Sequence, residues 1–157
     1  HPLAADFTLE MMRIGKKRTG GESLRWVGAD SLALPFPTGS FDAVVSAFLM
    51  RNVIDLSGAL REQHRVLKEA GRVVILDTSR PPDGLRGAAI RFHSQIVIPF
   101  LGQLVAGHRE AYTYLPQSTA GFLRAEELAA YLETAGFREV GFVRRMFGAV
   151  SIHWGAK

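Results

Sequence analysis

Cysteine is absent from the 157-residue chain, which excludes disulfide bonds, thiolate zinc sites and a cysteine nucleophile. The sequence also has no strand followed by G-x-G-x-G, the glycine-rich loop that cradles the ligand in many nucleotide-binding α/β folds. Neither H-E-x-x-H nor G-x-S-x-G occurs, so zinc-assisted hydrolysis and a serine hydrolase have no support. We expect no metal, and the chemistry must be sought in other patterns.

Long basic runs and long apolar runs are missing as well. The net charge is +4 and the pI about 9.8, but the basic residues form short groups such as 16–18 and 144–145. A solvated surface is favoured over a nucleic-acid face, with attraction to an anionic membrane as a weaker alternative. The most apolar region, Ile96 to Gly107, is too short and too interrupted to span a bilayer, and no signal peptide is evident. We expect a soluble, cytoplasmic protein that does not bind nucleic acid.

Strand and helix patterns alternate along the chain, and 47% hydrophobic against 22% charged residues suits one domain with a real core. The alternation predicts an α/β fold with a parallel sheet covered on both faces, followed by an antiparallel C-terminal hairpin. Strands are expected at Pro2 to Asp6, Leu24 to Val27, Phe41 to Phe48 and Arg72 to Asp77, helices at Thr8 to Lys17, Leu56 to Lys68 and Ala125 to Ala135, and the hairpin at Glu139 to Met146 and Ala149 to Trp154.

Several residues are expected to set the ends and faces of these elements. Asp55 should cap the second helix and Gly71 should close it, while Gly136 should stop the third helix in a left-handed conformation. The third helix should point Leu128, Tyr131 and Leu132 inward.

The alternation is interrupted at Pro81-Pro82-Asp83-Gly84. Residues 82–122 are predicted to form an inserted helical lid, with a helical segment over Leu85 to Val105 that is bent at Pro99. Packing on the rim of the sheet is the alternative role for its apolar residues.

The most informative stretch joins the loop Leu34-Pro35-Phe36-Pro37 to the buried strand and then to Arg51-Asn52. In open α/β sheets, ligands bind outside the carboxyl ends of the parallel strands, which is where Arg51 and Asn52 stand. The alternative is a core strand with Arg51 as a solvated cap.

The chain resembles the class I S-adenosylmethionine-dependent methyltransferases, and among them the ubiquinone/menaquinone biosynthesis C-methyltransferases, over nearly its whole length. The general class is matched by 6–12, by Ala29-Asp30-Ser31 ahead of 34–36, and by Ser40-Phe41-Asp42. The quinone branch is matched by Phe48-Leu49-Met50-Arg51-Asn52-Val53, Arg65-Val66-Leu67-Lys68, Arg109-Glu110-Ala111-Tyr112-Thr113-Tyr114-Leu115-Pro116 and the tail 148–155. The resemblance implies a Rossmann-like fold and S-adenosylmethionine as cofactor.

The cofactor residues implied are Asp6, Phe7, Met11, Asp30, Ser31, Ala47 and Phe48. An acid that ends a strand can accept both ribose hydroxyls, as Asp6 is placed to do. Asp30 could accept a hydrogen bond from the adenine amino group, while the Ser31 backbone N–H meets a ring nitrogen and Met11 packs on the ring. The alternatives are a structural cap for Asp6, an ordinary Asp-Ser turn at Asp30, and a core position for Phe48.

The reaction implied is methylation of a ring carbon of a polyprenylated quinol. Arg51 is expected to stabilise the phenolate electrostatically, since arginine stays protonated, and Asn52 to orient the ring oxygen. Arg109, Tyr112 and Tyr114 are expected to shape the substrate pocket, although each alone is more often structural. His108 and His153 are the candidate proton acceptors, with an ordinary surface or core position as the alternative. The prenylated substrate suggests peripheral contact with the inner membrane face through Ile96 to Leu104. The sequence leaves open whether the chain forms an oligomer.

The sequence departs from the family at its start, at one turn, and at Asp77, which stands where the family has a glutamate. The first strand and its glycine-rich loop are missing, and Lys68-Glu69-Ala70-Gly71 replaces a Lys-Pro-Gly-Gly turn. We therefore expect residues 1–157 to be a single partial methyltransferase domain with exposed apolar edges and impaired activity. Two alternatives stay open. One is a methyltransferase of the same fold acting on another lipid or small phenol, and the other is a non-catalytic binding module.

Overall fold

The computed structural model describes residues 2–80, 84 and 122–157. The predicted lid at 82–122, including the helical segment 85–105 and the bend at Pro99, lies outside the described residues except for residues 84 and 122.

The first strands form a small parallel sheet of their own. β1 (Leu3–Asp6) pairs with β2 (Arg25–Gly28), and α1 (Leu9–Lys16) and the short 3-10 turn η1 (Gly21–Ser23) connect them. The Trp26 indole lies against Gly15, and its Nε1 donates to the Gly21 carbonyl at 2.8 Å. A Cβ on Gly15 would approach the indole within 2.2 Å, so glycine is required where helix and strand meet this closely.

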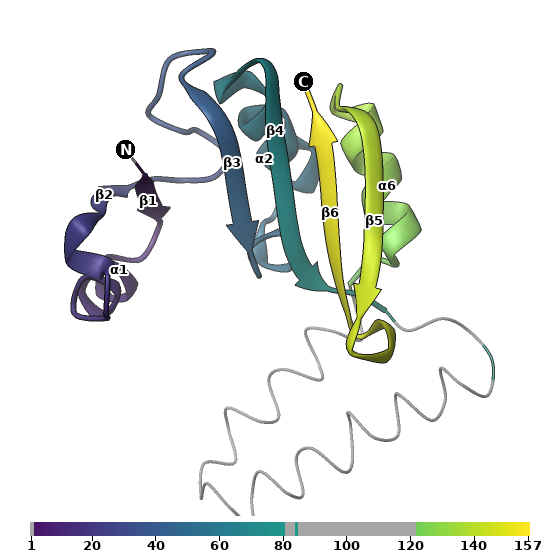
Figure 1. Cartoon of the computed structure of the whole chain (residues 1–157), viewed down its shortest axis with the longest axis horizontal. Coiled ribbons are helices and arrows are strands. Elements are labelled where there is room, and N and C mark those ends of the chain that lie inside the picture. The colour runs from purple at the N-terminus through teal and green to yellow at the C-terminus, as the bar shows by residue number, and fades with distance from the viewer. Residues whose placement is uncertain (1, 81–83, 85–121) are drawn as a thin grey trace, which may run out of the picture.

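The larger sheet has four strands in the order β3-β4-β6-β5 (Figure 1). β3 (Phe41–Ala47) and β4 (Leu67–Thr78) are parallel, while β6 (Val150–Ala156) runs antiparallel to both β4 and β5 (Arg138–Arg145). The 3-10 turns η2 (Met50–Asn52) and η4 (Met146–Gly148) follow β3 and β5. The predicted antiparallel hairpin is therefore confirmed.

Two helices cover one face of this sheet (Figure 1). They are α2 (Leu56–Val66) and α6 (Ala125–Thr134), and between them and the sheet lies a core of fully buried apolar side chains that includes Leu60, Leu67, Ile75, Leu128 and Leu132. Asp55 caps α2 as predicted, because its Oδ1 accepts from the Gly58 N–H at 2.9 Å. Gly136 follows α6 at φ 102°, the left-handed stop that the sequence predicts.

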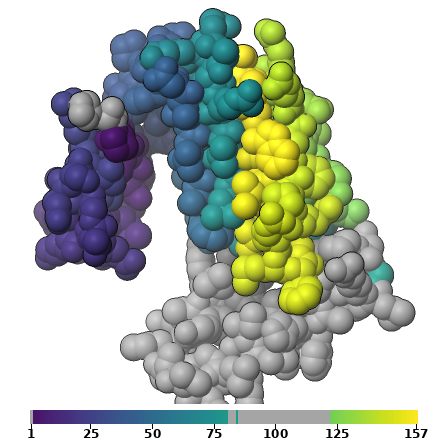
Figure 2. All heavy atoms as spheres, viewed as in Figure 1, coloured from purple at the N-terminus to yellow at the C-terminus, as the bar shows by residue number. Residues whose placement is uncertain are grey.

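The prediction of a sheet covered on both faces is wrong for the described residues. From Gly71 to Asp77, buried residues of β4 alternate with more accessible ones, and Val73 and Ile75 lie in the core, whereas Val45 on β3 is 74% exposed. Half-buried alternation of this kind is typical of a sheet with one open face. A space-filling view shows the β1–α1–β2 unit and the four-stranded sheet as separate masses on this side of the molecule (Figure 2).

The strands of the described residues form two sheets that share no strand. Large apolar side chains are exposed on both parts, among them Phe7, Leu9, Met11 and Val45.

Two local predictions need correction. α2 ends at Val66, because Leu67 already has extended backbone and begins β4. Gly71 therefore lies inside β4, where a Cβ would come within 2.7 Å of the Lys68 carbonyl oxygen, so close packing and not helix termination requires glycine. Tyr131 is 40% exposed and does not point into the core with Leu128 and Leu132.

Candidate functional site

Asp6 and Asp30 lie at the same edge of the small sheet. Asp6 ends β1, its carbonyl accepts from the Ala29 N–H at 3.0 Å, and Asp30 follows directly. Each carboxylate also shapes its own turn through Oδ1, which accepts from the Thr8 N–H at 2.7 Å in Asp6 and from the Leu32 N–H at 2.9 Å in Asp30. The structural roles considered for both acids are thus present, and Oδ2 of each acid accepts no hydrogen bond from the described residues.

The other predicted cofactor residues of this unit are accessible. Phe7 is 78% and Met11 56% exposed, and Ser31 is half-buried beside Asp30. Met12, one residue along the helix, is the buried methionine. The Met11 side chain is accordingly accessible, and its packing on an adenine ring stays a prediction.

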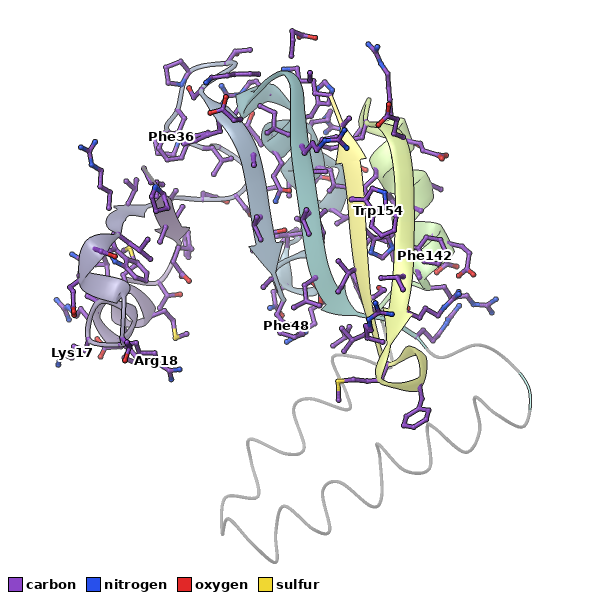
Figure 3. All side chains as sticks on the ribbon, viewed as in Figure 1. Lys17, Arg18, Phe36, Phe48, Phe142 and Trp154 are labelled. Atoms are coloured by element: carbon purple, nitrogen blue, oxygen red, sulfur yellow. The ribbon has the colours of Figure 1, made fainter. Side chains whose placement is uncertain are left out.

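The second group of candidates lies where β3 and β4 end. Phe48 continues the ladder, because its N–H donates to the Leu76 carbonyl at 2.8 Å, but its backbone is left-handed at φ 56°. A left-handed conformation is unfavourable for a residue with a Cβ, and such strain is concentrated at functional sites. Its ring is 42% exposed at the tip of β3 (Figure 3). Ala47, the last residue of β3, is exposed beside it.

Arg51 is held by a buried carboxylate. Its Nη1 contacts Asp77 Oδ1 at 3.1 Å, its backbone N–H donates to Asp77 Oδ2 at 3.4 Å, and its guanidinium carbon lies 4.9 Å from the centre of the Phe48 ring. The Arg51 side chain is 11% exposed and that of Asp77 is fully buried. The Thr78 N–H donates to Asp77 Oδ1 at 2.7 Å, which fixes the carboxylate in turn. Arg51 is therefore a positioned cation and not a solvated cap.

Sequence reasoning did not include Asp77 in the site. The sequence feature that could have indicated it is the apolar run of β4, which ends at Asp77. Asp77 stands 26 residues after Arg51, which follows the neighbouring strand β3. Parallel strands bring such residues to the same edge of the sheet.

Asn52 is also used locally. Its Nδ2 donates to the Phe48 carbonyl at 2.9 Å, and its own N–H donates to the Leu49 carbonyl at 2.9 Å. The side chain is exposed and stabilises the left-handed turn at Phe48. Its role toward a ring oxygen stays a prediction.

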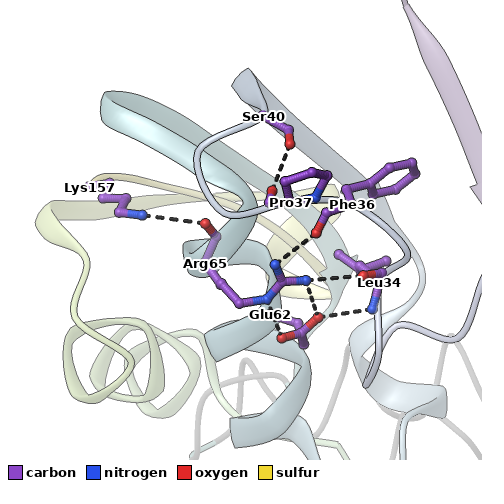
Figure 4. Close-up of polar contacts among 7 residues, drawn as sticks. All are labelled: Leu34, Phe36, Pro37, Ser40, Glu62, Arg65 and Lys157. Carbon is purple, nitrogen blue, oxygen red and sulfur yellow. Dashed lines mark hydrogen bonds and ion pairs between the residues drawn. The ribbon is translucent and has the colours of Figure 1, made fainter.

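A clamp from α2 fixes the loop that follows Asp30 (Figure 4). Arg65 donates through Nη1 to the Phe36 carbonyl at 2.7 Å and through Nη2 to the Leu34 carbonyl at 3.0 Å, while its Nε contacts Glu62 Oε1 at 2.7 Å. Glu62 Oε2 accepts from the Leu34 N–H at 2.9 Å. The hydrogen bonds from Arg65 hold the pKa of Glu62 below its ordinary value. The clamp ties the proline-bent loop to the core helix.

His153 is a core residue and not a candidate proton acceptor. It is fully buried, its Nε2 lies 2.8 Å from the Ala125 carbonyl oxygen, and its Nδ1 has no hydrogen-bond partner among the described residues. Burial lowers the pKa of the imidazole below its ordinary value of 6.5. Arg109, Tyr112, Tyr114, His108 and the segment 96–104 lie outside the described residues.

Within the described residues, no group of three or more metal-ligating side chains is close enough to hold a metal ion. In the same part of the chain, every helix is too short or too polar to cross a membrane.

Comparison with known proteins gives a consistent result. The profile of the ubiE/COQ5 methyltransferase family matches residues 3–157. A ubiquinone/menaquinone biosynthesis C-methyltransferase from Desulfotalea psychrophila is 41% identical over 152 residues, covering 97% of this chain and 62% of that protein. A demethylmenaquinone methyltransferase from Thermus thermophilus is 43% identical over 155 residues, covering 98% of this chain and 70% of the relative.

A solved structure supports the fold. A SAM-dependent methyltransferase from Thermotoga maritima superimposes with a TM-score of 0.69 at 20% identity, covering 98% of this chain and 72% of that one. The chain thus has an α/β methyltransferase fold with a mixed sheet, and it spans less than two thirds of the length of the Desulfotalea relative.

Proposed function

Because the chain belongs to the ubiE/COQ5 methyltransferase family, we propose that it serves S-adenosylmethionine-dependent C-methylation of a polyprenylated quinol in respiratory quinone biosynthesis. The observation that carries the proposal is the Arg51–Asp77 pair at the shared carboxyl edge of β3 and β4. A fixed, desolvated guanidinium beside an exposed aromatic ring suits a substrate that carries both a phenol oxygen and a flat ring.

The residues at the edge of the small sheet fit the adenosine half of the cofactor. Asp6 and Asp30 each use Oδ1 for a local turn, which holds Oδ2 for an external hydroxyl or amino donor. No glycine-rich loop is present in the sequence to hold the methionine half. When bound, S-adenosylmethionine supplies an electrophilic methyl group.

Arg51 would act on the quinol by charge. A phenol that loses its proton pushes electron density onto the ring carbon that forms the new C–C bond, and a cation near the oxygen stabilises that phenolate. Asp77 keeps the guanidinium in place, and the Phe48 ring lies 4.9 Å from its central carbon. The preorganised charge contributes because it needs no reorganisation during the reaction.

Titration of S-adenosylhomocysteine into the 157-residue chain by calorimetry tests this proposal. We expect binding in the wild type, and its loss in an Asp6→Ala and Asp30→Ala double variant. A Glu10→Ala and Glu22→Ala double variant removes the same charge from exposed positions of the same unit and should bind normally. A folded wild-type chain that binds nothing would contradict the proposal for this chain.

One observation favours a second candidate, a non-catalytic binding module. Exposed apolar residues around β1 and β3, among them Phe7, Leu9 and Val45, suit association with another molecule. A chain that binds S-adenosylhomocysteine but transfers no methyl group to a quinol would support this candidate. A methyltransferase that acts on another lipid or small phenol would show transfer to that acceptor instead.

A further inference from the structure

The turn between β5 and β6 presents two apolar side chains to solvent. Met146 is 69% and Phe147 80% exposed, whereas Gly148 beside them is buried. Both residues have left-handed backbone, at φ 50° and φ 57°, and the Ala149 N–H donates back to the Met146 carbonyl at 3.1 Å. The turn thus holds these side chains outward in a conformation that residues with a Cβ adopt reluctantly. We call this pair the Met146–Phe147 tip.

Arginines gather around the tip. Arg145 precedes it directly, is exposed, and forms no ion pair with the described residues. Arg144 pairs with Glu126 and Arg80 with Glu127, so these two cations are partly neutralised. Arg80 belongs to the same surface, because the neighbouring Ser79 N–H donates to the Ala149 carbonyl at 2.9 Å. The apolar tip therefore stands directly beside the exposed cation of Arg145, with two ion-paired arginines nearby.

The tip lies at the same end of the sheet as the candidate substrate group. Thr78 of β4 pairs with Val150 of β6, and Asp77 pairs with Ser151. The partner of Arg51 is thus only a few residues from the tip across the ladder, and Phe48 ends β3 at this same end (Figures 1 and 3).

We propose that the Met146–Phe147 tip inserts into the interface of an anionic bilayer, with Arg145 and its neighbours contacting the lipid phosphates. Two side chains offer far less area than a stable protein interface needs, but they suffice to anchor a convex turn in a fluid lipid surface. Cations next to an apolar group favour an anionic surface over a neutral one. The inference rests on the proposed function for its purpose, since a polyprenylated quinol resides in the membrane, but the binding itself requires no methyl transfer.

Co-sedimentation of the whole chain with phosphatidylcholine vesicles, with and without phosphatidylglycerol, tests the proposal. We expect binding to the anionic vesicles, weaker binding to the neutral ones, and weakening by salt. A Met146→Ser and Phe147→Ser double variant should bind about tenfold more weakly or worse, and Arg145→Gln about fivefold more weakly.

The matched control is a Leu9→Ser and Ile14→Ser double variant, which removes two exposed apolar side chains from α1. It should bind like the wild type, and circular dichroism should show that all variants are folded. Absence of binding in the wild type, unchanged binding by the tip variant, or an equal loss in the α1 variant would each overturn the proposal. Because S-adenosylhomocysteine binding is measured separately, failure of the proposed function would be recognised independently.

Discussion

Replacing Asp77 by asparagine tests whether the buried pair positions Arg51. Asparagine keeps the shape of the side chain and can still accept from the Thr78 N–H, but it removes the charge that faces Arg51 Nη1 at 3.1 Å. Breaking a buried ion pair by removing one partner costs about 3–5 kcal/mol, because the remaining charge stays desolvated. We expect about 3 kcal/mol, at the lower end of this range, since Arg51 retains 11% exposure and the Phe48 ring.

Urea unfolding followed by tryptophan fluorescence measures this change. A Trp26→Phe background leaves Trp154 of β6 as the reporter of the four-stranded sheet. Glu10→Gln is the matched control, because it breaks the Glu10–Arg13 pair, in which both side chains are more than two-thirds exposed. Exposed pairs contribute about 0.2–1 kcal/mol, so this control should change little.

A double-mutant cycle separates the pair from its surroundings. Arg51→Met combined with Asp77→Asn removes both charges and should be much less destabilised than the sum of the single variants. Additive effects, or an Asp77→Asn loss as small as that of Glu10→Gln, would refute the reasoning that Asp77 positions Arg51.

Two further predictions concern His153 and Arg65. Burial lowers the pKa of His153, so the folded state holds the imidazole neutral while the unfolded chain takes up a proton below about pH 6.5. The free energy of unfolding should therefore fall from pH 7 to pH 5, and this fall should be shallower in His153→Gln. An equally steep fall in the variant would contradict this assignment. Lysine cannot reproduce the fork by which Arg65 binds Glu62 and two loop carbonyls, so Arg65→Lys should lower the free energy of unfolding in urea by about 1–2 kcal/mol. The control Arg61→Lys alters an exposed ion pair of 3.7 Å and should lower it by about 0.5 kcal/mol or less. Equal losses in the two variants would contradict the clamp.

Hydrophobic periodicity and capping residues predict most of the described fold, because helices and strands depend largely on residues close together in the sequence. β1, α1, β2, β3, α6 and the hairpin lie within one or two residues of their predicted bounds, since period and capping residues are visible in the chain itself. The start of β4 was placed at Arg72 and not at Leu67, because glycine has two uses. Gly71 permits the close approach of the Lys68 carbonyl inside β4, and composition cannot separate this use from a helix stop.

The candidate site was only partly predictable for a related reason. Asp6, Asp30 and Arg51 stand at strand exits, which a sequence reveals once the strands are recognised. The partners that hold them are distant in sequence. Asp77 is 26 residues from Arg51, and the carbonyls bound by Arg65 are 29 and 31 residues away from it. Several acids and arginines could form such an ion pair. Strand register and side-chain packing decide which of them meet, and both depend on the folded structure.

The two halves of the candidate site differ in what supports them. Arg51 and Asp77 are anchored to a four-stranded sheet with a buried core under two helices. Asp6 ends β1 and Asp30 follows β2 in a two-stranded sheet, an arrangement that is marginally stable by itself. Met12 is the one large apolar side chain that is buried within the described β1–α1–β2 unit. A ligand held by these acids must therefore also stabilise their unit, and its affinity decreases by the free energy needed to order that unit. Cofactor affinity and the positioning of Arg51 are thus energetically separable in this chain, and a loss of one leaves the other measurable.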